Sequence, residues 1–133
     1  MKATLITLLT ICALIISGCT TPVAVDPQTG QSQTAEYRLG FFYAPLDAPL
    51  GKIFQASIAE LDDMGYFRTG ELHKEDAITI YARKVGDERI TVRAYTPLPD
   101  DTFQSQSVLR IRVGKLGNLA ESQQIYARIR DAL

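Results

Sequence analysis

Residues 77–96 read AITIYARKVGDERITVRAYT and hold two alternating segments joined by a short polar loop. Apolar residues recur at every second position on both sides of the loop, which is the period of a strand with one buried face. The expected inward set is Ile78, Ile80, Ala82, Ile90, Val92 and Ala94. This stretch therefore predicts an antiparallel sheet with one apolar face.

The length of this loop decides which residues of the two strands lie opposite one another. A two-residue turn at Gly86-Asp87 would place Ile80 opposite Arg93, which puts a core residue and a charge on one face. A three-residue loop, residues 86–88, restores the apolar match. In that register Ala82 lies opposite Val92, and Tyr81 lies opposite Arg93.

Two amphipathic helices are expected, one before and one after the four central strands in the sequence. Asp47 is the predicted N-cap of the first helix, which ends near Gly65. Asn118 and Glu121 have the spacing of a capping box at the start of the second helix, which extends toward Leu133.

Three further strands complete the predicted fold. They are expected at residues 37–44, where Tyr37, Leu39, Phe41 and Tyr43 form the inward set, at 66–72, and at about 103–113, where Val108, Arg110 and Arg112 point outward. The chain is thus predicted to be an α+β domain with an antiparallel sheet of about five strands and two helices packed on one face, in the order β-α-β-β-β-β-α. This order resembles a single repeat of the TATA-binding-protein-like fold, although DNA binding does not follow from a shared fold.

The N-terminal residues resemble the signal and lipobox of bacterial lipoproteins. Lys2 precedes an apolar run that ends in Ile16-Ser17-Gly18-Cys19, so that two small residues come directly before a cysteine. The resemblance implies cleavage after residue 18 and acylation of Cys19, which would attach the protein to a membrane. In such lipoproteins an inner-membrane retention signal would usually place Asp after the cysteine, so with Thr20 there the resemblance implies the outer membrane, where the domain would face the periplasm. An uncleaved anchor, or an ordinary signal that leaves a free thiol, stays an alternative.

Composition restricts the classes of partner. The 133-residue chain has a formal net charge of −1, and removal of residues 1–18 leaves 13 basic and 15 acidic residues and a net charge of −2. Such a balance predicts no nucleic acid partner and no electrostatic attraction to an anionic bilayer. Residues 19–36 are rich in Thr, Gln, Pro and Ser, so we expect a flexible tether before a single domain at 37–133.

Two segments carry a resemblance to a known family. They are LDAPLGKIFQA at residues 46–56, and IRVGKLGN at 111–118 continuing into SQQIY at 122–126. They resemble the small bacterial lipoproteins grouped as domain of unknown function 3568. The resemblance implies a lipoprotein with an α+β domain, and it brings no activity, cofactor or catalytic residue.

The residues offer little for catalysis or metal binding. His73 is the sole histidine. Cys12 would leave with the signal and Cys19 would be acylated, so no free cysteine remains for a clustered zinc site or a Cys-His pair. The neighbouring carboxylates Asp62-Asp63 and Asp100-Asp101 diverge and are poor acid/base pairs. We expect no enzyme, metal or cofactor, and a hydrolase that uses His73 is a distant alternative.

The outward face of the sheet is the candidate interaction site. Arginine and tyrosine are residue types that recognise planar anions, sugars and protein surfaces, although a solvated sheet face explains the same residues. We therefore expect a lipid-anchored module that binds an envelope protein or an anionic glycan, or else a structural lipoprotein that acts through self-association; the oligomeric state is not indicated. The candidate residues are Tyr81, Arg83, Arg93, Tyr95, Arg110 and Arg112, accompanied by Thr79 and Thr91.

Overall fold

The structure is a computed structural model that describes residues 21–25 and 35–133. The predicted signal peptide and Cys19 lie outside the described residues. In the part of the chain that is described, no helix is long and apolar enough to span a membrane.

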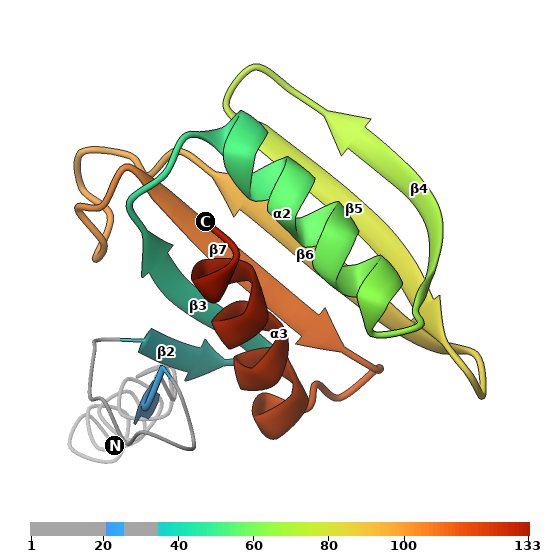
Figure 1. Ribbon diagram of the computed structural model, residues 1–133. Coiled ribbons are helices and arrows are strands. Elements are labelled where there is room, and N and C mark those ends of the chain that lie inside the picture. The colour runs from blue at the N-terminus through green and yellow to red at the C-terminus, as the bar shows by residue number, and fades with distance from the viewer. Residues whose placement is uncertain (1–20, 26–34) are drawn as a thin grey trace, which may run out of the picture.

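Seven strands and two helices form the described fold, which is of the predicted α+β class (Figure 1). Their bounds are β1 (Thr21–Val23), β2 (Ala35–Arg38), β3 (Phe41–Leu46), α2 (Leu50–Asp63), β4 (Phe67–His73), β5 (Ala77–Lys84), β6 (Glu88–Tyr95), β7 (Ser107–Val113) and α3 (Leu119–Asp131). The strands make one antiparallel sheet in the order β1-β2-β3-β7-β6-β5-β4. Both helices cover the same face, and we call the opposite side the open face (Figure 1).

The prediction of about five strands was wrong, partly because the first expected strand is two. Leu39 and Gly40 have φ angles of 51° and 80° and form a tight turn, so residues 37–44 divide into β2 and β3. This turn reverses the predicted faces of the second part. Phe42 and Ala44 are buried beneath the helices, whereas Leu39 is 90% exposed.

The other additional strand lies in the segment expected to be a tether. Thr21–Val23 pairs with β2, and Val25 and Ala35 are both fully buried in the core. The Gln123 side chain of α3 donates a hydrogen bond to the Ala24 carbonyl. Residues 21–25 and 35–36 therefore belong to the folded domain, and the rest of the expected tether lies outside the described residues.

The central hairpin has the predicted faces but not the predicted register. Its loop has three residues, as expected, but these are Val85–Asp87, because Lys84 pairs with Glu88. Ala82 thus lies opposite Ile90 and Tyr81 lies opposite Thr91, two residues from the predicted register. A shift of two residues returns every side chain to its own face, which is why the apolar pattern could not detect it.

The helices close the core over this sheet. Asn118 caps α3 as predicted, since its side chain accepts a hydrogen bond of 3.1 Å from the Glu121 amide. The N-cap of α2 is Pro49, and not Asp47, whose carboxylate accepts from the Gln106 amide. The Tyr126 hydroxyl of α3 donates to the Pro45 carbonyl at 2.7 Å. The largest fully buried side chains include Phe42, Ile53, Leu61, Ile90, Leu109, Ile111, Ile125 and Ile129.

Candidate functional site

The open face collects arginines from four strands. One row across the sheet runs from Tyr43 through Arg110 and Arg93 to Thr79, each opposite the next. Glu36 is the sole carboxylate that the described strands place on this face. The arginines that strand alternation assigns to it are Arg38, Arg83, Arg89, Arg93, Arg110 and Arg112.

All six predicted site residues thus share one face. A second row holds Arg112, Thr91 and Tyr81, while Arg83 and Tyr95 lie toward the two ends of the central hairpin. The structure brings these residues together as the strand pattern predicted; their role in binding stays a prediction.

Aromatic rings support four of the guanidinium groups. The Arg38 guanidinium carbon lies 4.4 Å from the centre of the Tyr43 ring. Arg110 and Arg112 both lie 4.7 Å from the centre of Phe41. Arg93 lies further from its ring, at 5.9 Å from Tyr95. Such contacts orient a guanidinium without neutralising its charge.

Five of the six open-face arginines have no acidic partner in the described structure. Among the described residues, no carboxylate forms an ion pair with Arg38, Arg89, Arg93, Arg110 or Arg112. The buried Nε atoms of Arg93 and Arg110 also have no hydrogen-bond acceptor there. Because these two residues lie directly opposite each other, like charges face each other across β6 and β7.

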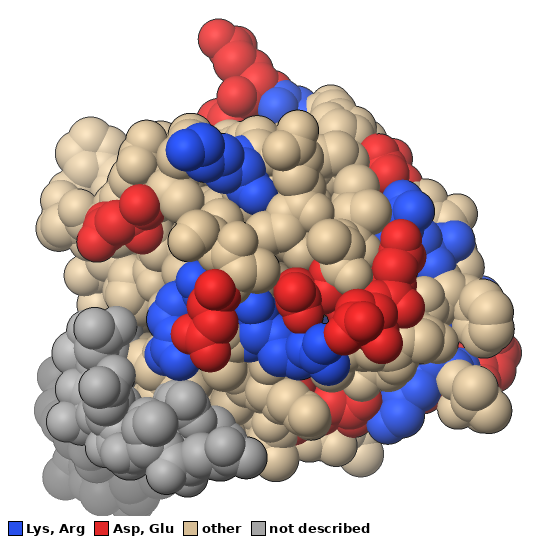
Figure 2. Space-filling view, viewed as in Figure 1, with Lys and Arg blue, Asp and Glu red and all other residues tan. Residues whose placement is uncertain are grey.

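The helical side differs, because three of its cations form ion pairs with carboxylates. Arg68 Nε lies 2.9 Å from Asp62, Arg128 Nε lies 2.8 Å from Glu60, and Lys84 Nζ lies 2.9 Å from Glu121. Figure 2 shows acidic and basic side chains interleaved in a band across this side. Although the net charge of the chain is close to zero, arginines without a carboxylate partner in the described structure gather on the open face.

Tyr95 contributes a neutral hydroxyl to the open face. Burial raises the pKa of Tyr95 to about 12, and the nearby Asp101 carboxylate acts in the same direction. Its phenol therefore stays protonated at neutral pH. Its cross-strand neighbour Val108, predicted to point outward, is fully buried although it lies on the face opposite the helices. The open face is thus partly covered at this end.

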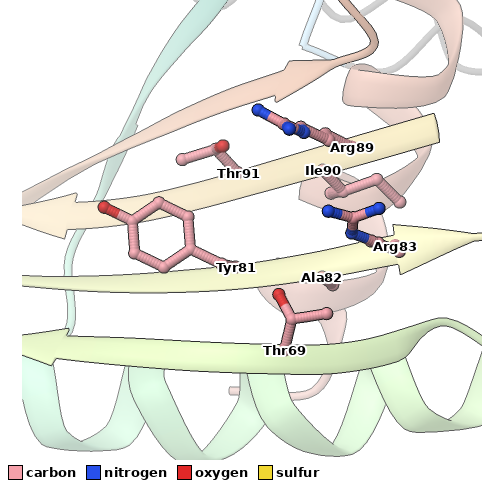
Figure 3. A pocket seen from close by; sticks show the side chains of 7 residues that line it. All are labelled: Thr69, Tyr81, Ala82, Arg83, Arg89, Ile90 and Thr91. Carbon is pink, nitrogen blue, oxygen red and sulfur yellow. The ribbon is translucent and has the colours of Figure 1, made fainter. Parts of the chain in front are cut away.

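The open face carries two open depressions. One of about 770 Å³ is lined by Arg89, Thr91, Arg112 and Lys115, together with Asp87, Glu88 and Gly114. The other, of about 280 Å³, lies over β4, β5 and β6, where Tyr81, Arg83, Arg89 and Thr91 surround it (Figure 3). Arg83 is paired with Asp87 here, whereas Arg89 lies directly opposite Arg83 without a carboxylate of its own in the described structure. This surface presents guanidinium and hydroxyl groups to a ligand, but it does not enclose one.

The sequence reasoning missed four residues of this face. Phe41 and Tyr43 were assigned to the core and Arg38 lay outside the candidate set, because the turn at Leu39 was not recognised. Arg89 was treated as the first residue of its strand and was left out, although the outward positions of Thr91 and Arg93 could have identified it. The real face is therefore more basic and more aromatic than predicted.

Residues considered for catalysis are engaged elsewhere. The His73 ring packs edge-on against Phe54 with 4.9 Å between ring centres, and its Nε2 lies 2.9 Å from Glu71. Asp62 and Asp63 pair with two different arginines. No group of three metal-ligating side chains occurs in residues 21–25 and 35–133. The absence of catalysis and of a metal stays a prediction.

Comparison with known proteins gives a family and no activity. No curated protein matches the sequence. The family model described as a protein of unknown function, DUF3568, matches residues 2–132, which is nearly the whole chain. The chain therefore belongs to the DUF3568 family.

Proposed function

We propose that this protein is a lipid-anchored module of the bacterial cell envelope that binds an anionic glycan on its open face, without catalysis. The anchor would be Cys19, acylated after removal of residues 1–18, in the outer membrane facing the periplasm. The observation that carries the binding proposal is the set of arginines on the open face without carboxylate partners in the described structure.

A half-buried arginine with a buried, unpaired Nε and a like charge opposite it is unfavourable for the fold alone. The aromatic contacts hold these groups in place, so a ligand meets guanidinium groups that are already oriented. Guanidinium forks bind carboxylate and phosphate groups through two parallel hydrogen bonds, and aromatic rings offer flat surfaces to sugars.

The shape of the face favours an extended ligand. Neighbouring strands lie ~4.7–4.9 Å apart, so the row from Tyr43 to Arg93 presents side chains at short, regular intervals. Both depressions on this face are open to solvent, so neither encloses a small molecule as typical ligand sites do. A polymer with repeated negative charges matches this arrangement better.

The test removes charge from the two facing arginines. Alginate serves as a soluble polyuronate, and dextran as the neutral comparison. We expect the variant Arg93→Gln/Arg110→Gln to bind alginate at least tenfold more weakly, or ~1.4 kcal/mol, because charge-assisted hydrogen bonds are lost. The control Lys52→Gln/Lys74→Gln removes the same charge away from the open face and should bind normally. Equal losses in both variants, or binding to dextran, would contradict the proposal.

The anchor is tested by intact mass measurement on membrane-extracted protein. The expected product begins at Cys19 and carries the mass of its acyl chains. A product that begins at Met1, or one with an unmodified cysteine, would remove the proposed location.

A second candidate function is self-association through β4. This strand ends the sheet, and all seven of its residues are exposed. An unpaired strand edge can add a strand from another chain. Sedimentation of the unacylated domain should then give a dimer mass that Leu72→Pro reduces to a monomer. The finer resemblance to a TATA-binding-protein repeat is likewise a proposal about fold, and we propose no nucleic acid partner.

A further inference from the structure

One end of the sheet carries three connections side by side. The β2–β3 turn lies at the start of β3, and residues 114–118 follow the end of β7. The β5–β6 loop meets them at the same end because Ile90 lies opposite Val113. We call this the turn end; the connection from β6 to β7, residues 96–106, lies at the other end of the sheet (Figure 1).

The turn end exposes large apolar side chains at its tips. Leu39 is 90% exposed, Leu116 is 89% exposed and Val85 is 82% exposed, and Phe67 at the start of β4 is also exposed. Single exposed apolar residues are ordinary on protein surfaces. Here, however, one falls in each of the three connections at one end of the domain.

Two of these tips are fixed against each other. A Cβ atom on Gly117 would lie 2.3 Å from the Gly40 carbonyl oxygen, and one on Gly40 would lie 2.7 Å from the Leu116 carbonyl oxygen. Both glycines have φ near +80°. Leu39 and Leu116 are therefore presented by two turns in close backbone contact.

Thr21, where the described structure begins, lies at this same end. Thr21 lies opposite Tyr37, which is two residues before Leu39. Cys19 lies two positions before Thr21 in the sequence, and two residue steps span at most ~7 Å. An acylated Cys19 would therefore keep the turn end close to the bilayer surface.

Basic residues directly precede the apolar tips at Leu39 and Leu116, and the connection that carries Val85 also holds the exposed Asp87. Lys115 is exposed and directly precedes Leu116, and Arg38 directly precedes Leu39. Apolar side chains at the headgroup boundary with lysine or arginine beside them form the usual pattern of interfacial membrane contact.

We infer that the turn end sits in the headgroup region of the bilayer, with Leu39 and Leu116 inserted toward the acyl chains. The inference rests on the proposed anchor at Cys19. The partner that the turn end contacts is the surface of the lipid bilayer. The domain would stand on this end, which leaves the open face accessible to a ligand beside the membrane.

The absence of tryptophan from the chain makes the inference directly testable. The variants Leu116→Trp and Leu98→Trp each introduce a single fluorophore, at the turn end and at the opposite end respectively. Both original side chains are largely exposed, so both substitutions should be tolerated. The full acylated protein is reconstituted into vesicles of phosphatidylethanolamine and phosphatidylglycerol, with and without bromine on the acyl chains.

We expect brominated lipid to quench residue 116 and shift its emission to the blue, while residue 98 keeps the emission of exposed tryptophan. If the protein is acylated by mass but neither tryptophan is quenched, the proposed orientation is wrong while the proposed anchor is still supported. Equal quenching of both would overturn the orientation as well. Protein whose mass shows no acyl chain would remove the anchor, and this inference with it.

Discussion

Replacing Arg93 by methionine should stabilise the domain. Arg93 is half-buried, its Nε has no acceptor among the described residues, and it lies opposite Arg110. Methionine keeps an unbranched apolar stem of similar length, so it preserves most of the packing while it removes the charge and the unpaired donor.

Three contributions decide the sign of the change. Removing a buried donor without an acceptor recovers ~1 kcal/mol, the lower end of the usual penalty. Removing one of two like charges that lie opposite each other in a sheet recovers ~0.2–1 kcal/mol. Loss of the contact with Tyr95, whose ring centre is 5.9 Å away, costs ~0.5 kcal/mol. The net expectation is a gain of about 1 kcal/mol in the free energy of unfolding.

Urea unfolding followed by circular dichroism measures this gain. The midpoint should rise while the dependence on urea concentration stays constant, because the same surface is exposed on unfolding. Arg68→Met is the matched control, since Arg68 lies on the helical side and pairs with Asp62 at 2.9 Å and Glu71 at 3.5 Å. The same chemical change should there lower the midpoint.

The essential result is that the urea midpoint changes in opposite directions in Arg93→Met and Arg68→Met. If Arg93→Met lowered the midpoint as Arg68→Met does, the Arg93 guanidinium would be part of what holds the fold together. The interpretation of the open face as a ligand site would then lose its main support. A variant that is more stable and also fails to bind alginate would show that this arginine is retained for binding.

Three other predictions concern the fold itself. Gly117→Ala should lower the free energy of unfolding by ~2 kcal/mol or more, because the φ of +82° disfavours a Cβ atom and that atom would meet Gly40. Gly51→Ala is the control: a Cβ there has nothing within 4 Å, so the free energy of unfolding should rise by up to ~1 kcal/mol, measured as a higher urea midpoint. Burial raises the pKa of Tyr126 from 10.0 to about 12. The neutral phenol therefore contributes its full stabilisation below pH 10 and loses it as the pH rises through 12. In unfolding curves measured over a series of pH values, Tyr126→Phe should show a smaller loss of stability at alkaline pH. Val25→Ala should cost roughly 2 kcal/mol because Val25 is fully buried, and an unchanged midpoint would return its segment to the role of a tether.

The parts of the fold with one clear apolar period could be predicted from the sequence. Residues 78–82 and 90–94 alternate between the two faces of the sheet, and the face of each strand was assigned correctly. The buried face of α2 could be predicted from its apolar period as well, since Ile53 and Leu61 lie on that face. A strand register, by contrast, can slip by two residues without any change in the pattern.

The region around Leu39 could not be predicted because its pattern is ambiguous. Three consecutive aromatic residues, Phe41–Tyr43, place apolar side chains on both faces of β3, so no period indicates which face is buried. Leu39 is an unusual residue for a turn with positive φ. β1 joins the sheet mainly through backbone pairing, with one buried residue just beyond it, and such a contribution leaves no signal in the sequence.

The sheet order also bears on how the chain folds. Every neighbouring pair of strands is consecutive in the chain except β3 and β7, where Phe42 meets Ile111 across most of the domain's length. The strands β1–β3 form one group and β4–β7 the other, and only the pairing of β3 with β7 joins them. Because this pairing closes a long loop in the chain, it slows folding. Pulsed hydrogen exchange should accordingly find β5 and β6 protected early and β3 late, with the joining step as the barrier that sets the folding rate.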